Sequence, residues 1–377
     1  MTLSPNNSLD LSGVPQGNIL KAVKSSCKHL AETATADISI QDESIDQFLS
    51  TFDVNLFKDL TNTEPFRVPL RFDSIEAEIN FIALLDLLNF GSGWRVELHN
   101  AVGRGASEAI KFGAMAMHIS GITATTEYLK SVTISEISSL FDIPVTHEVP
   151  HPSLPVVIGE PAPIRPFVQA ITDTLKETGE CLESQGFKSL GHFILQVTQP
   201  SNDSPRKAAD VVEAIVRLLP SMRDYGEWHG QRVYILKRAQ LLVCDLYRRF
   251  GGSDPKRFAF QELDQLTIFS DNVVPRVLEH FGIIKIHNPS LVQMIQAGRD
   301  LGKDSDRWDW ALRAIAIEAT ERILDKAHSW QDDSDPARSE TLRALAAFRL
   351  DNFLWGMGKQ KDIRSLTRLV NKQTVYF

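Results

Sequence analysis

Apolar and polar residues recur along most of this chain with the spacing of amphipathic helices. Within residues 43–60 the apolar positions that mostly follow one helical face are Ile45, Phe48, Leu49, Phe52 and Phe57. A second helical run covers residues 75–88, and after Pro166 the pattern is helical almost continuously. Several of these runs end in glycine, as helix C-termini often do. The sequence therefore predicts a mainly α fold, with a single large helical domain over residues 21–377.

Three kinds of segment depart from this pattern. Residues 1–20 are rich in Ser, Asn, Pro and Gly, so we expect a flexible N-terminus. Seven prolines lie between Pro144 and Pro166. Because proline fixes φ and removes a backbone donor, the segment at about residues 142–166 is predicted to be irregular. Only residues 230–236 (GQRVYIL) and 373–377 (QTVYF) resemble strands, and both are short.

Composition narrows the class of protein. The chain has 377 residues, of which 43% are hydrophobic, and this is enough apolar material for a large core. The net charge is -8 and no long basic run occurs, whereas tight binding to a nucleic-acid backbone needs a concentrated positive face. We therefore expect no stable nucleic-acid partner. A small anionic ligand stays possible because it needs only a local pair of cations.

The cysteines and the N-terminus indicate a compartment. The three cysteines are far apart, and no Cys-x-x-Cys occurs, so neither a disulfide framework nor a zinc site is expected. The first twenty residues lack the features of a secretory or transit peptide. The longest apolar run, residues 79–91, is broken by Asp86 and is too short to span a bilayer. We expect a cytoplasmic protein without a membrane partner, a metal or a cofactor.

Lys237 has an unusual place on a predicted helix. If the helix starts near Leu236, Lys237 shares a partly apolar face with Leu241 and Cys244. It also lies near the positive end of the helix dipole, where cations are disfavoured. Lys237 is then either a lysine whose stem is buried and whose ammonium reaches water, or a cation directed at an anion. This stretch alone favours the first interpretation.

Asp271 precedes an apolar helical stripe that ends at Gly282. Pro275 is acceptable only in a first helical turn, so the helix must begin just after Asp271. Either Ser270 or Asp271 then caps that helix. A carboxylate at a helix N-terminus is also stabilised in its charged form, which suits a residue that stays anionic beside a developing positive charge. From the residues alone, capping is the favoured role.

Six motifs in this order resemble the queuosine salvage proteins, a family of queuosine 5'-phosphate N-glycosylase/hydrolases. They are LLDLLNF (84–90), LPSMRD (219–224), KRAQLLVCDLY (237–247), LTIFSDNVVP (266–275), LEHFGII (278–284) and LDNFLW (350–355). The resemblance runs from about residue 75 to the C-terminal VYF. It implies a helical fold similar to helix-hairpin-helix DNA glycosylases. It also implies hydrolysis of queuosine 5'-monophosphate to queuine, a 7-deazaguanine, and ribose 5-phosphate.

The resemblance also gives roles to particular residues. Asp271, in the matched FSDN motif, takes the catalytic role, because a fixed carboxylate stabilises the positive charge that develops on the sugar. Lys237 is implied to contact the 5'-phosphate or a ribose oxygen, and Phe269 to stack on the base. The remaining substrate-binding candidates are Asp86, Phe90, Asp351 and Trp355. The carboxylates among them complement the guanine-like edge and the cationic amino group of queuine.

Some positions depart from the family pattern. Asn272, Val273 and Arg276 stand where an aromatic residue, a basic residue and a glutamine are common. Met222 replaces an aromatic residue, and Gly356 an acidic one. These differences leave open an alternative, a non-catalytic helical protein that binds a deazaguanine base or nucleotide. A glycosylase that acts on polymeric DNA or RNA is disfavoured by the net charge of -8.

Overall fold

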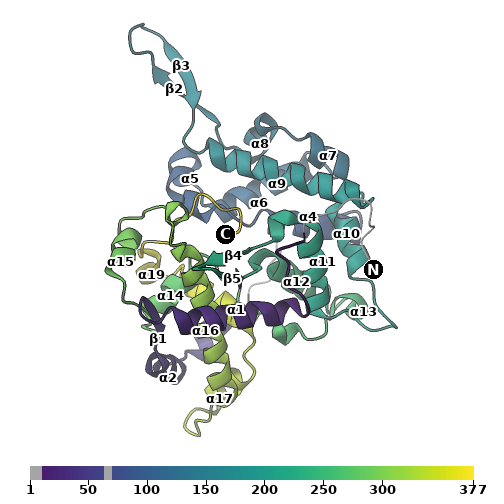
Figure 1. The fold of residues 1–377 in the computed structure, drawn as a ribbon. Coiled ribbons are helices and arrows are strands. Elements are labelled where there is room, and N and C mark those ends of the chain that lie inside the picture. The colour runs from purple at the N-terminus through teal and green to yellow at the C-terminus, as the bar shows by residue number, and fades with distance from the viewer. Residues whose placement is uncertain (1–10, 63–69) are drawn as a thin grey trace.

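The computed structural model describes residues 11–62 and 70–377, so half of the N-terminal segment that we expected to be flexible lies outside it. Helices dominate these residues, which confirms the mainly α prediction (Figure 1). The longer helices are α1 Ile19–Thr33, α2 Asp42–Ser50, α3 Val54–Thr61, α4 Ile75–Leu87, α5 Arg95–Val102, α6 Ala106–Ile119, α8 Ile134–Phe141, α9 Arg165–Ser184, α10 Leu190–Val197, α11 Ala208–Leu218, α12 Lys237–Phe250, α15 Pro289–Gln296, α16 Trp308–His328, α17 Pro336–Arg343 and α18 Ala347–Met357. The shorter ones are α7 Thr126–Ser131, α13 Pro255–Phe258, α14 Val274–His280, α19 Lys361–Arg364 and the 3-10 turns η1 Ser92–Trp94, η2 Pro220–Met222, η3 Leu263–Gln265 and η4 Leu301–Lys303.

The strands of the described residues form small antiparallel pairs. The pairs are β1 Ile38–Ile40 with β6 Ile284–Ile286, β2 Thr146–Pro150 with β3 Val157–Pro161, and β4 Tyr225–Trp228 with β5 Gln231–Tyr234. The strand expected in residues 230–236 is therefore confirmed as β5. The strand expected in residues 373–377 is wrong, because that tail has no ladder partner. Its last side chain, Phe377, is instead buried, with its ring 4.5 Å from the guanidinium carbon of Arg313.

The proline-rich segment is more regular than we expected. Up to the start of α9 at Arg165 it is not helical, but β2 and β3 pair as a hairpin that projects from the helices at the top of Figure 1. Pro150 and Pro161 are the last residues of the two strands, and Pro152 and Pro155 lie in the connecting turn. Proline is tolerated at strand ends and in turns because no ladder hydrogen bond is lost there. The segment at residues 142–166 thus contains a hairpin.

The N-terminal boundary of the helical part also differs from the expectation. Helix α1 begins at Ile19, and the side chain of Asn18 caps it by accepting a 3.0 Å hydrogen bond from the backbone N–H of Lys21. Ile19 and Leu20 are completely buried, and Val14 is buried ahead of them. The helical part therefore begins before residue 21, because the amphipathic helix α1 packs along α16.

Two helices are buried on nearly every face and pack against several other helices. Helix α16 has buried residues along almost its whole length and contacts α1, α14 and α18. In α4 every residue from Ile79 to Leu87 is buried, between α10 and α12. A helix that is apolar all round belongs in the interior. In the described part of the chain, no helix combines the length and the apolar character needed to cross a bilayer.

Candidate active site

The loop that carries Asp271 connects η3 to α14 and is buried from residue 266 to residue 272. Side chains from three helices hold its backbone. Gln240 on α12 accepts a 2.9 Å hydrogen bond from the N–H of Thr267. Asp351 on α18 accepts one of 2.8 Å from the N–H of Phe269, and Arg313 on α16 donates one of 2.9 Å to the carbonyl of Ser270. Because a buried backbone needs such partners, these bonds fix the loop in one conformation.

The carboxylate of Asp271 caps the helix that follows it. Its Oδ1 accepts hydrogen bonds from the N–H groups of Val273, at 2.6 Å, and Val274, at 3.2 Å. Helix α14 begins at Val274 with Pro275 in its first turn, so the expected helix start and the capping role are both confirmed. The hydroxyl of Ser270 donates instead to the carbonyl of Arg313. Among the described residues, no hydrogen bond reaches Oδ2 of Asp271, so capping uses only one of its two oxygens.

Lys237 opens helix α12, and its ammonium does not reach water. Its Nζ donates to the carbonyl oxygen of Asn89, at 3.2 Å, and to Oδ1 of the same residue, at 3.0 Å. Burial lowers the pKa of Lys237 to about 8, and the nearby carboxylate of Asp271 opposes that shift. The interpretation that the sequence favoured, a lysine whose ammonium reaches water, is therefore wrong. Lys237 is a buried cation close to Asp271.

A fully buried ion pair links these two residues. Arg313 donates to both carboxylate oxygens of Asp224, at 2.9 and 2.6 Å. The same carboxylate accepts a 3.1 Å hydrogen bond from the backbone N–H of Lys237, while Arg313 holds the carbonyl of Ser270. The pair therefore fixes the start of α12 relative to the residue before Asp271.

Three further carboxyl groups lie buried in this part of the molecule. Burial, and then the charge of Asp271, raise the pKa of Asp351 to about 7. Burial also raises the pKa of Asp245 to about 7. The pKa of Asp86 is raised well above its usual value, mainly by burial and then by the negative charge of Asp245. Within the described residues, Oδ2 of Asp86 and Oδ1 of Asp245 are buried without a hydrogen bond. The positive charge of Lys237 lowers the pKa of both Asp86 and Asp351, so all these carboxyl groups belong to one charged cluster.

The predicted aromatic contacts have different surroundings. Phe269 is buried in the loop that carries Asp271. Trp355 is half-buried and lies one helical turn after Asp351, with the ammonium of Lys359 3.3 Å from its ring centroid. Phe90 packs edge-on against Phe167, at 6.0 Å between centroids. Phe269 and Trp355 thus lie near Asp271 and Asp351 in the chain, and Phe90 follows Asn89, which accepts from Lys237.

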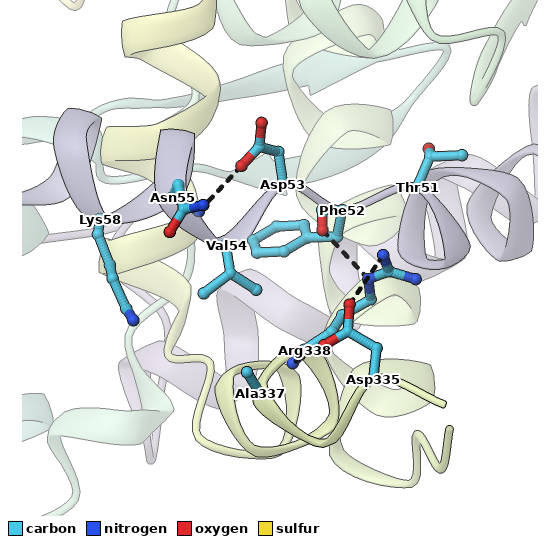
Figure 2. A pocket seen from close by; sticks show the side chains of 9 residues that line it. All are labelled: Thr51, Phe52, Asp53, Val54, Asn55, Lys58, Asp335, Ala337 and Arg338. Atoms are coloured by element: carbon cyan, nitrogen blue, oxygen red, sulfur yellow. Dashed lines mark hydrogen bonds and ion pairs between the residues drawn. The ribbon is translucent and has the colours of Figure 1, made fainter. Parts of the chain in front are cut away.

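A cavity of about 440 Å³ lies elsewhere, between the α2–α3 connection and α17 (Figure 2). Several of its polar groups are bonded to one another. Arg338 donates to the carbonyl of Phe52, at 3.2 Å, and pairs with Asp335, at 3.0 Å. Asp53 caps α3 by accepting from the N–H of Asn55. None of the predicted site residues lines this cavity, so it is a space between packed helices and not the candidate site.

Comparison with known proteins identifies the family. The family model described as queuosine salvage protein matches residues 70–377, which is most of the chain. The chain belongs to the queuosine salvage family. The resemblance noted in the six motifs is therefore confirmed, and every predicted site residue lies within the matched range.

Curated members of the queuosine salvage family align over most of their length. The relatives named queuosine 5'-phosphate N-glycosylase/hydrolase include one from Sphaerobacter thermophilus, which is 28% identical over 298 residues, 76% of this chain and 78% of the relative. One from Nematostella vectensis is 24% identical over 315 residues, 80% of this chain and 82% of the relative. One from Mus musculus is 24% identical over 293 residues, 76% of this chain and 77% of the relative.

The sequence did not identify every polar residue of this candidate site. Asp245 follows Lys237 by eight residues, so helical periodicity alone was enough to place both on one side of α12. Asp224 ends the LPSMRD motif, but its partner Arg313 lies 89 residues further along the chain. A pair so distant in sequence has no local signal.

Proposed function

We propose that this protein hydrolyses the N-glycosidic bond of queuosine 5'-monophosphate and releases queuine for salvage into tRNA modification. The observation that carries the proposal is the carboxylate of Asp271, fixed by a buried network beside the cation of Lys237. The relatives named queuosine 5'-phosphate N-glycosylase/hydrolase support the substrate. The fold is expected to be similar to helix-hairpin-helix glycosylases, and the substrate is a mononucleotide.

In this mechanism Asp271 stabilises positive charge on the sugar. As the bond between C1' and the base nitrogen breaks, the ribose becomes oxocarbenium-like, and the free Oδ2 of Asp271 faces it. Water then adds its hydroxyl to C1', and its proton ends on the base nitrogen. A 7-deaza ring lacks the imidazole nitrogen that purine glycosylases often protonate, so stabilisation of the sugar cation carries more of the rate. Lys237 contacts the 5'-phosphate or a ribose oxygen in this arrangement.

The buried carboxyl groups supply contacts for the base. Asp86 and Asp351 are proposed to bind the donor groups of the guanine-like edge and the cationic amino group of queuine. Asp245 joins them, because its charge acts on Asp86; its Oδ1 has no hydrogen bond but lies 3.8 Å from Nη1 of Arg248. Phe269 and Trp355 are the candidates to stack on the ring, with Phe90 supporting the site from the core.

The test is turnover of queuosine 5'-monophosphate by the purified protein, with queuine detected by mass spectrometry. Asp271→Asn keeps the side chain's shape and a capping oxygen but removes its charge, so we expect kcat to fall by roughly 100-fold or more. Asp59→Asn, an exposed carboxylate on α3, is the matched control and should keep full activity. Absence of turnover by the wild type, or full turnover by Asp271→Asn, overturns the proposal.

The non-catalytic alternative rests on the departures from the family pattern. In the structure these residues build local contacts. Asn272 donates to the carbonyl of Leu369 and Arg276 to that of Thr367. A Cβ on Gly356 would lie 3.2 Å from Leu60, so a small residue fits there. Thermal stabilisation by queuine together with no nucleotide turnover supports this alternative.

We propose a cytoplasmic setting, which the cysteines support. All three, Cys27, Cys181 and Cys244, are free and buried. Free thiols are typical of a reducing compartment, which supports the cytoplasm as the place of this reaction.

A further inference from the structure

The hairpin of β2 and β3 projects from the helices near α5 and α8 (Figure 1), and we call its residues 146–161 the arm. The tip of the arm is apolar. Leu154, Val156 and Val157 are 57%, 52% and 61% exposed. A two-stranded hairpin alone is only marginally stable in water, and grouped exposed apolar side chains mark interaction surfaces. The tip of the arm therefore has the character of a contact surface.

The edges of the arm are poorly suited to pairing with a further strand. At the turn, the N–H of His151 donates a 2.9 Å hydrogen bond to the carbonyl of Val156. Bonded and non-bonded pairs alternate along an antiparallel ladder, so Pro150 and Pro161 occupy positions whose backbone nitrogen points outward. Proline has no N–H, and edge strands use it to block pairing. A partner therefore meets the arm through side chains.

A groove of about 410 Å³ lies at the root of the arm. The ends of α5 and α8 form two of its walls, and the segment that leads into β2 forms the third. The lining residues are Ala101, Val102, Ser138, Ser139, Asp142, Ile143 and Pro144. Four of these side chains are apolar and the others are polar. The groove thus suits apolar side chains at its centre and polar groups at its rim.

Arg104 adds an unused donor beside this groove. Its Nη2 pairs with Oδ2 of Asp142, at 2.5 Å, whereas Nη1 is buried without a hydrogen bond among the described residues. A buried charged donor without an acceptor is costly. The arm carries Glu148 and Glu160 and has no lysine or arginine. The charge of the arm therefore complements that of Arg104.

We propose that a second copy of this chain docks here, with the tip of each arm seated in the groove of the other copy. Two arms that lie antiparallel across a two-fold axis bring each tip to the root of the other arm, where the groove lies. Because the contact is reciprocal, it closes as a dimer and does not continue as a filament. This assembly is independent of the proposed function.

The size and polarity of the contact suit a stable dimer. A standard interface involves about 20–30 residues a side. The arm and the seven residues that line the groove together reach that range. Glu148 lies closer to the tip than Glu160 does, so Glu148 is the residue that brings a carboxylate to Nη1 of Arg104 in the other copy.

Sedimentation velocity over a range of concentrations tests the assembly. At micromolar concentration the wild type should have twice the mass of the 42.2 kDa chain. L154D/V157D changes two exposed side chains, so it should unfold like wild type, but its Kd should rise roughly 100-fold or more because the groove cannot solvate the new charges. Ile119→Asp, at the end of α6, is the matched control, since that side chain is also apolar and is 75% exposed. It should dimerise like wild type.

The proposed ion pair has its own test. Arg104→Gln and Glu148→Gln should each weaken the dimer about tenfold, as expected for a lost charged hydrogen bond. The double variant should be no weaker than either single one, because both remove the same interaction. Fully additive losses contradict the contact between these two residues.

Engineered thiols test where the tip lies. The natural cysteines are buried and should not react. L154C/A101C should form a disulfide-linked dimer under mild oxidation, whereas Leu154→Cys alone should not.

Three outcomes overturn the proposal. They are a wild type that stays monomeric at every concentration measured, a dimer that L154D/V157D leaves intact, and an absence of linkage in L154C/A101C. Vesicles of phosphatidylcholine and phosphatidylserine test a different partner. A monomer that binds these vesicles, and loses that binding in L154D/V157D, assigns the tip to a lipid surface and refutes the dimer.

Discussion

Asp224→Asn is the substitution whose effect the structure specifies most closely. The carboxylate of Asp224 is completely buried and accepts three hydrogen bonds, two from Arg313 and one from the N–H of Lys237. Asparagine retains one acceptor oxygen but loses the charge. The guanidinium of Arg313, only 1% exposed, is then an unpaired charge in the interior.

The expected cost follows from that unpaired charge. Breaking a buried ion pair from one side destabilises a protein by about 3–5 kcal/mol, because the remaining ion keeps its desolvation penalty. A surface pair is worth about 0–1 kcal/mol. Asp46→Asn, which removes the pair between Asp46 and Lys326, is therefore the control, since the Asp46 side chain is 57% exposed. The two variants should differ by several kcal/mol in the free energy of unfolding.

Urea unfolding followed by circular dichroism measures this difference, and the slope with denaturant should stay constant across the variants. Because the same pair fixes Lys237 relative to Ser270, Asp224→Asn should also lower kcat under conditions where it is folded. If Asp224→Asn costs no more than Asp46→Asn, the ion pair does not hold the site as argued.

Two further predictions concern the charged cluster. Since the pKa of Lys237 is lowered to about 8, its ammonium is lost as pH rises through that value, so kcat/KM should fall above about pH 8; a profile that is flat to pH 10 contradicts a role for this charge. Asp351→Ala leaves the buried N–H of Phe269 unpaired and should cost about 1–3 kcal/mol in urea unfolding, whereas Asp351→Asn, which keeps an acceptor, should recover most of it. Equal stability of these two variants contradicts the anchoring role of Asp351.

Local rules explain which parts of the fold were predictable. The start of α14 follows from Pro275 and Asp271, and β5 follows from a short run of strand-forming residues. The pairing of β1 with β6 joins three-residue strands almost 250 positions apart, too short for any alternation to be visible. The tail at 373–377 has strand-forming residues but forms no strand, and Phe377 packs on Arg313 instead. Such outcomes depend on tertiary contacts, which override propensity.

In the candidate site too, local rules predict some features and tertiary contacts determine the others. Asp271 and Lys237 carried local anomalies, a carboxylate at a helix start and a lysine at the wrong end of a dipole. Sequence physics favoured a cap for the first and an exposed ammonium for the second, and the structure corrects only the second. Asp224 carried no such anomaly, because its charged partner Arg313 lies 89 residues further along the chain. Charge clusters assembled from distant segments need the fold before they can be recognised.

The polarity of the cluster favours a mononucleotide over a polymer as the substrate. The charge of Asp271 raises the pKa of Asp351, which lies near the other buried carboxyl groups. The same charge raises the pKa of Arg368, which lies near other arginines. The proposed substrate has the same polarity about its glycosidic bond, with a donor-rich, cationic base on one side and a phosphate dianion on the other. A polymer needs a long basic track along its backbone. A few arginines beside one carboxylate suit a single phosphate, as in the proposed mononucleotide substrate.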